Sequence, residues 1–161
     1  MPAATQPTSV STSIMVQAPI EHAFSVFTEG IATWWNPDHH LLEAKVDEMV
    51  FEPFVGGHII DRGVDGSECR WARVLAYEPP TRVVFSWDIN LNWEIETDPE
   101  KTSEVEVRFT AEGPDLTHVT LEHRHIDRHG EGWEQMRAAV GSPDGWNLTR
   151  FAEVAAAATR W

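Results

Sequence analysis

Residues 103–125 read SEVEVRFTAEGPDLTHVTLEHRH, and they carry the clearest structural pattern in the chain. Apolar and polar side chains alternate on both sides of residues 113–115, which are the turn-forming Gly, Pro and Asp. Alternation with a period of two is typical of strands that have one buried and one solvated face. The stretch therefore predicts an antiparallel hairpin built from the strands Ser103–Ala111 and Thr117–His125.

The chain on the N-terminal side of this hairpin holds further strand patterns, separated by strong turn signals such as Gly-Gly, Asp-Gly and Pro-Pro. Five more strands are predicted there: Ser11–Gln17, Glu43–Glu52, His58–Arg62, Glu68–Tyr77 and Arg82–Ile89. With the hairpin they form an antiparallel sheet of about seven strands, whose apolar face needs a cover.

Helices are expected near both ends of the chain, where apolar residues recur at helical spacing. The predicted segments are a helix that has Pro19 in its first turn and an apolar stripe from Ile20 to Phe27 and that ends at Gly30, a short helix or turn at Ile31–Trp35, a short helix around Trp133, and a final helix that starts at residues 142–144 and carries Leu148 and Phe151. The final helix is the natural cover for the sheet. We expect residues 1–10 to form a flexible tail and residues 11–161 to form a single α+β domain.

Composition excludes several classes of function. The 161 residues contain 12 Lys and Arg against 26 Asp and Glu, which gives a formal net charge of −14 and disfavours nucleic-acid binding. No apolar stretch approaches the roughly 18 residues of a transmembrane helix, so we expect no membrane insertion. The N-terminal residues show no secretory signal, and a cytoplasmic location is the simplest expectation. The single cysteine, Cys69, is expected to be a buried, inert thiol.

The histidines are the candidate chemical groups. Alternation places His123 and His125 on one strand face, and His129 follows closely, so a zinc site is one interpretation. No carboxylate or thiol accompanies them at a recognised metal-site spacing, and we therefore expect no metal. We favour a hydrogen-bonded His123 with His125 near solvent. The chain also lacks nucleophile and nucleotide-binding motifs, so no catalytic residues and no cofactor are predicted.

Tryptophan is the unusual part of the composition, with eight residues. An indole is large, carries one N–H donor, and suits either an ordinary core or the wall of an apolar pocket. Six of the tryptophans lie on elements expected to meet the interior: Trp34, Trp35, Trp71, Trp87, Trp133 and Trp146.

Several motifs, in order along residues 11–158, resemble the SRPBCC (START-like) superfamily, in the branch named after the activator of heat-shock-protein ATPase homologues. They are APIEHAFSVFTEGIATWW, FEPFVGGHI, DGSECRWARVLAYEPPTRVVFSW, SEVEVRFTAEG, VTLEHRHIDRHGEGW and GWNLTRFAEVAA. The resemblance implies a helix-grip fold, in which a curved antiparallel sheet wraps around a long C-terminal helix. It also implies an internal cavity of the kind that holds apolar molecules in relatives.

We therefore expect a monomer or homodimer that binds a small, largely apolar molecule between the sheet and the C-terminal helix. The predicted lining is Trp35, Phe51, Trp71, Trp87, Phe109, Leu121, His123 and Phe151, with His123 as the polar contact. One alternative is a co-chaperone-like module that contacts a protein partner through its acidic surface and the loop Asn90–Thr102. A less favoured alternative is a cyclase or hydrolase that uses His123 or His125 as acid and base.

Overall fold

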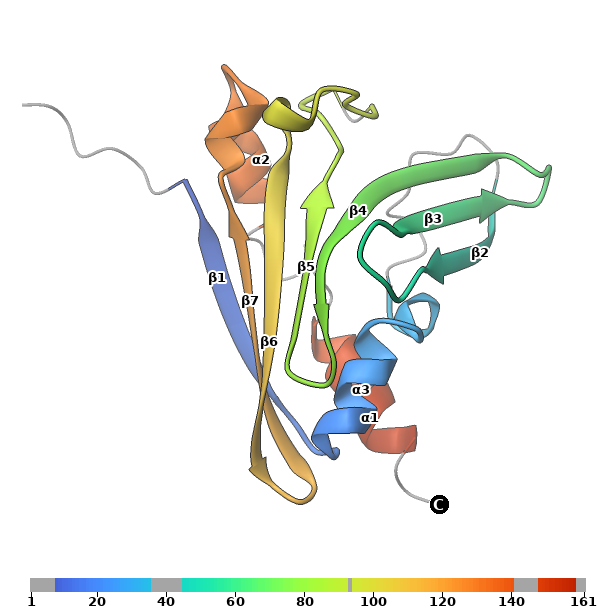
Figure 1. Cartoon of the computed structure of the whole chain (residues 1–161), viewed down its shortest axis with the longest axis vertical. Coiled ribbons are helices and arrows are strands. Elements are labelled where there is room, and N and C mark those ends of the chain that lie inside the picture. The colour runs from blue at the N-terminus through green and yellow to red at the C-terminus, as the bar shows by residue number, and fades with distance from the viewer. Residues whose placement is uncertain (1–7, 36–44, 93, 141–147, 159–161) are drawn as a thin grey trace, which may run out of the picture.

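The computed structural model describes residues 8–35, 45–92, 94–140 and 148–158. Its sheet contains seven strands: β1 (Val10–Val16), β2 (Val46–Phe51), β3 (His58–Gly63), β4 (Glu68–Glu78), β5 (Arg82–Trp87), β6 (Ser103–Gly113) and β7 (Leu116–Arg124). Their order across the sheet is β1-β7-β6-β5-β4-β3-β2, and every neighbouring pair is antiparallel (Figure 1). The predicted hairpin is thus the pair β6–β7 near one edge.

Three α-helices and three short 3-10 helices complete the described fold. They are α1 (Ile20–Phe27), α2 (Trp133–Val140), α3 (Leu148–Ala158), η1 (Ile31–Thr33), η2 (Pro99–Lys101) and η3 (Ile126–His129). The predicted α+β helix-grip fold is confirmed, with α1 and η1 as the two short helices after the first strand. The start of the predicted strand Glu43–Glu52 and the predicted cap at residues 142–144 lie outside the described residues.

The N-terminal strand begins slightly earlier than the sequence predicts. Val10 is already part of β1 and pairs with His123 of β7. Before it, the carbonyl oxygen of Thr8 accepts a hydrogen bond from the backbone N–H of Ile126, and that of Ser9 accepts one from Arg137. Residues 8–10 are therefore held in place, and the rest of the predicted tail, residues 1–7, lies outside the described residues.

Two bulges in β4 give the sheet its curvature. On one side, Ile59 and Ile60 of β3 pair with Ala72 and Arg70, which leaves Trp71 as an extra residue. On the other side, a similar shift against β5 leaves Leu75 without an opposite residue. A bulge bends its strand and increases the local twist. Figure 1 shows β4 curving from the direction of β5 toward that of β3 and β2.

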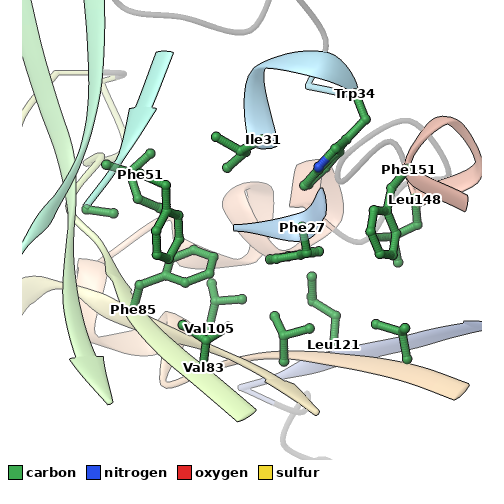
Figure 2. Close-up of a cluster of buried hydrophobic side chains, with 14 of the residues drawn as sticks. Phe27, Ile31, Trp34, Phe51, Val83, Phe85, Val105, Leu121, Leu148 and Phe151 are labelled. Carbon is green, nitrogen blue, oxygen red and sulfur yellow. The ribbon is translucent and has the colours of Figure 1, made fainter. Parts of the chain in front are cut away.

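The core lies between the curved sheet and the helices α1 and α3. Phe27 of α1 is fully buried, and its ring centroid lies 5.3 Å from that of Phe151 on α3. Trp34 packs 5.4 Å from the same Phe151 ring and donates its indole N–H to the carbonyl of Val26. Figure 2 shows these rings above Leu121, with Phe51 and Phe85 grouped beside them. The contacts of Phe151 therefore fix α3 against the rest of the domain.

Candidate ligand-binding site

Four aromatic rings from distant parts of the sequence form a continuous row. Trp35 is stacked on Trp71, with centroids 5.2 Å apart and an interplanar angle of 29°. Trp71 meets Trp87 edge-on at 5.6 Å, and Trp87 lies 5.3 Å from the ring of His123. Trp35 is half-buried whereas His123 is completely buried. This aromatic row, defined as Trp35, Trp71, Trp87 and His123, therefore leads from a partly exposed ring to a polar group in the interior.

The sheet register explains how the row is assembled. Trp87 is the last residue of β5 and pairs with Ser103, the first residue of β6. His123 of β7 pairs with Val105 of β6, two residues further along the same face. Trp71 reaches Trp87 from the bulge in β4, where the extra residue redirects the side chain. Three strands thus bring the row together at one end of the sheet.

A buried serine connects two histidines at the inner end of the row. The Oγ atom of Ser103 lies 2.7 Å from Nε2 of His123 and also 2.7 Å from Nε2 of His129. A serine hydroxyl has one proton, so Ser103 donates to one imidazole and accepts from the other. Ser103 is itself fully buried, whereas His129 on η3 is half-buried. We refer to these three residues as the Ser103 bridge.

Burial keeps the imidazoles of the bridge uncharged at neutral pH. Desolvation, followed by the neighbouring His129, lowers the pKa of His123 to about 3. Desolvation also lowers the pKa of His129, although the carboxylates of Glu96 and Asp88 act in the opposite direction. Neutral imidazoles can each accept and donate one hydrogen bond, which is what a bridge through a single hydroxyl requires.

An ion pair supports the start of β6. The carboxylate of Asp88 accepts hydrogen bonds of 2.9 and 3.0 Å from Arg73, and the same guanidinium donates to Oγ1 of Thr102 at 3.2 Å. Asp88 and Thr102 are both buried. Because Thr102 directly precedes Ser103, this pair fixes the backbone from which the Ser103 hydroxyl projects.

The eight predicted lining residues divide into two groups. Trp35, Trp71, Trp87 and His123 form the aromatic row. The other four residues pack in the core. The ring centroid of Phe109 lies 5.1 Å from that of Phe24 and 5.8 Å from that of Phe27. Leu121 lies beneath Phe27, Phe151 contacts α1, and the ring centroids of Phe51 and Phe85 are 6.3 Å apart (Figure 2). Of the other tryptophans considered, Trp34 is core, Trp133 is half-buried, and Trp146 lies outside the described residues.

The expectation that His123 and His125 share a strand face is wrong. β7 ends at Arg124, and His125 adopts a left-handed backbone with φ of 61° immediately before η3. Its side chain is exposed, whereas His123 is buried and hydrogen-bonded, as we favoured. The break in the strand redirects the chain so that His129, rather than His125, reaches Ser103.

Ser103 and Asp88 were missed as candidate site residues. A signal for Ser103 was present, because alternation with Val105 and Val107 places it on the buried face, where a hydroxyl needs a partner. Asp88 gives no such signal, since its partner Arg73 is separated from it by 15 residues and by a turn.

Other chemistry is limited in the part of the chain that the structure describes. Within it, no three His, Cys, Asp or Glu side chains are grouped so as to hold a metal ion. Cys69 is buried, and desolvation, with a smaller effect of Asp61, raises the pKa of its thiol to about 11. The thiol therefore stays protonated and unreactive, as expected. None of the described helices is long and apolar enough to span a membrane.

The family comparison agrees with the fold. The family model described as activator of Hsp90 ATPase homolog 1-like protein matches residues 17–153, and the chain belongs to this family. This confirms the resemblance inferred from the sequence motifs, and the fold supports a ligand-binding domain. A search of curated proteins found no match.

Three solved structures illustrate the similarity. The chain is 40% identical to Txn09, described as an anthrahydroquino-gamma-pyrone synthase complexed with SUM, over 92% of this chain and 96% of that one, with a TM-score of 0.66. It is 26% identical to CalC of Micromonospora echinospora, a self-sacrificing resistance protein, over 96% and 97% of the two chains, with a TM-score of 0.69. Protein MLL2253 of Mesorhizobium loti shares the fold. It is 17% identical to this chain over 95% of this chain and 99% of that one, with a TM-score of 0.65.

Proposed function

We propose that this protein binds a small, planar and largely apolar molecule along the aromatic row, between the sheet and the C-terminal helix. The observation that carries the proposal is the row itself, in which successive rings lie 5.2 to 5.6 Å apart and the last one is a hydrogen-bonded imidazole. Indole faces favour flat aromatic ligands, and one convergent polar group at the end of an apolar surface gives orientation.

The comparison with Txn09 supports a fused-ring aromatic ligand in particular. That protein, 40% identical to this chain, is described as a synthase of an anthrahydroquino-gamma-pyrone, a fused aromatic system. Two tryptophans of the row, Trp71 and Trp87, stand edge-to-face at 70°, and a third, Trp35, is stacked near the partly exposed end. Such an arrangement offers both faces and edges to a flat ligand with polar substituents.

A titration with 1,4-dihydroxyanthraquinone, using dodecanoic acid as a flexible comparison, tests the proposal through tryptophan fluorescence. We expect saturable quenching by the planar dye with a dissociation constant on the order of micromolar, and weaker binding of the fatty acid. Trp87→Ala should weaken dye binding at least about tenfold, which is roughly 1.4 kcal/mol, while the protein stays folded. Trp133→Ala removes an indole that is outside the row, so it is the matched control and should leave the affinity unchanged.

The opposite result would point to a filled interior. In a filled core, Trp87→Ala leaves a void and lowers the free energy of unfolding by about 3–5 kcal/mol. That cost, together with no dye uptake by the wild type, would reject the ligand-binding proposal. The alternative of a protein-interaction module would then take its place.

A further inference from the structure

We propose that the Ser103 bridge is a proton relay that performs acid–base chemistry on the ligand of the aromatic row. This inference rests on the proposed function and adds a reaction to it. His123 is assigned as the catalytic residue that contacts the ligand, and Ser103 and His129 carry protons between it and the edge of the domain. No carboxylate, metal or nucleophile is needed for the step.

The placement of the three groups is the first argument. His123 stands at the buried end of the row, 5.3 Å from the ring of Trp87, with its Nε2 atom 2.7 Å from Ser103. His129 lies on the other side of the same hydroxyl, at the same distance, and is half-buried. The hydrogen bonds therefore lead from the end of the proposed ligand site toward the edge of the domain. A purely structural serine would need only one of these partners.

The second argument is that the hydrogen bonds of the Ser103 bridge can reverse, so that the serine hydroxyl donates either to His123 or to His129. Both imidazoles are neutral, and a neutral imidazole can accept a proton at one nitrogen while it gives one up at the other. Among the described residues, Nδ1 of His129 has no hydrogen-bond partner. No hydrogen bond from these residues to Nδ1 therefore fixes the tautomer of His129. Its Nε2 atom can either donate or accept, so Ser103 can donate to either histidine.

The surrounding charges favour a proton that arrives at His129. Desolvation lowers the pKa of His129, and the carboxylates of Glu96 and Asp88 partly offset this effect because they stabilise the protonated ring. The negative charge of Asp88 is compensated by its ion pair with Arg73, whereas Arg73 does not compensate the charge of Glu96. The other neighbouring charges point elsewhere: Arg128 pairs with Glu104, and Arg137 of α2 donates to a backbone carbonyl.

The reaction can be written with anthrone, a tricyclic aromatic ketone, as the probe. The C–H bond at its methylene carbon breaks, the electron pair moves through the rings to the carbonyl oxygen, and the proton bonds to Nδ1 of His123. The Nε2 proton of His123 passes to Oγ of Ser103, whose own proton passes to Nε2 of His129. His123 ends neutral in its other tautomer, His129 ends as imidazolium, and the ligand carries the negative charge. Release of the anion into heavy water then lets it take up deuterium at the same carbon, and His129 gives its extra proton to the solvent. His123 regains its first tautomer when its Nδ1 proton leaves to heavy water at the vacated site and a deuteron returns through His129 and Ser103.

Deuterium uptake by anthrone in oxygen-free heavy water therefore tests the relay, with mass spectrometry as the readout. We expect the wild type to accelerate exchange above the protein-free rate, and Ser103→Ala to reduce the acceleration roughly 100-fold, a typical acid–base effect. The dissociation constant of anthrone, measured on the same samples, should stay within about threefold, because Ser103 does not contact the ligand. His129→Gln should behave like Ser103→Ala, and its site is half-buried, so it tests the relay even if the serine variant unfolds.

Two controls separate the relay from general damage. Ser86→Ala removes another buried serine hydroxyl, which accepts the backbone N–H of Arg73, and His118→Gln replaces an imidazole on the outer face of β7. Both should keep the wild-type exchange rate. Ser103→Thr keeps a hydroxyl and should restore most of the exchange lost in Ser103→Ala.

The outcomes distinguish the relay from the binding proposal. If the wild type does not bind anthrone or the anthraquinone dye, both proposals fall. Binding without accelerated exchange overturns the relay alone. So does exchange that persists at the wild-type rate in folded Ser103→Ala and His129→Gln, because the proton would then reach solvent by another route.

Discussion

At His123 a polar side chain occupies a position where the strand pattern calls for an apolar one. Its neighbours on the same face of β7, Val119 and Leu121, are fully buried, and so is His123. A buried imidazole is tolerated here because Ser103 supplies a hydrogen bond of 2.7 Å. The cost of charging such a group is high, so burial lowers the pKa of His123 to about 3.

We predict that the protein loses stability as the pH falls below about 6.5. Burial lowers the folded-state pKa of His123 to about 3, whereas the unfolded value is near 6.5, so the unfolded state binds more protons between these values. The free energy of unfolding should be level above about pH 6.5 and fall by roughly 1.4 kcal/mol per pH unit below it.

Urea unfolding of the wild type and of His123→Gln, at about pH 7.5 and about pH 5, measures this effect. Carboxylates titrate in both proteins, so the difference between the two isolates the histidine. The advantage of the wild type should shrink by about 2 kcal/mol toward pH 5. An equal loss in both proteins would contradict the assigned burial.

At the scale of the elements, the ends of β5 and β6 are joined by an ion pair rather than by apolar packing. Arg73 of β4 binds the Asp88 carboxylate just beyond β5 and reaches Thr102 just before β6. The backbone N–H of Glu96 also donates to the carbonyl of Asp88, which ties the intervening loop to the same point. Most described residues of this loop are exposed, and the contact at Asp88 anchors the loop to the domain together with the buried Ile89.

Asp88→Ala should lower the free energy of unfolding by about 1–3 kcal/mol. The value stays below that of a fully buried pair, because the Arg73 side chain is 33% exposed and water can solvate it after the change. Chemical denaturation gives the measurement. Glu68→Ala, which breaks an exposed pair with Arg62, is the control and should cost less than about 1 kcal/mol. Similar costs for both variants would show that the pair does not hold the loop.

At the scale of the whole molecule, negative charge dominates. The formal net charge is −14. Several arginines of the sheet are engaged in ion pairs. Arg82, Arg108 and Arg124 all lie within 3.5 Å of the Glu106 carboxylate, which is 9% exposed. These arginines therefore do not form a free basic surface.

The protein should not be retained on a DNA or heparin column at about 0.1 M salt. Binding to a polyanion gains free energy when basic residues release counterions, and here the basic residues of this surface are engaged with Glu106. A basic protein of similar size on the same column gives the positive control. Retention that disappears with rising salt would refute this prediction.

The sequence by itself determined the elements and their class. Alternation in residues 103–125 and the turn signals between the other strands are local properties, and they predicted the strands of the sheet to within a few residues. The apolar stripe with Phe151 likewise predicted α3 as the cover, and Phe151 does pack on α1. Local patterns suffice here because period-two and helical spacing follow directly from backbone geometry.

The tertiary structure alone decided which of these residues form a site. The bulge at Trp71 and the end of β7 at Arg124 depend on pairing between strands, so no local pattern revealed them. The first brings Trp71 to Trp87, and the second turns His125 outward and lets His129 reach Ser103. The Ser103 hydroxyl thus meets His123, 20 positions away, and His129, 26 positions away, because the pairing of β6 with β7 sets their register, which is a property of the sheet and not of any one segment.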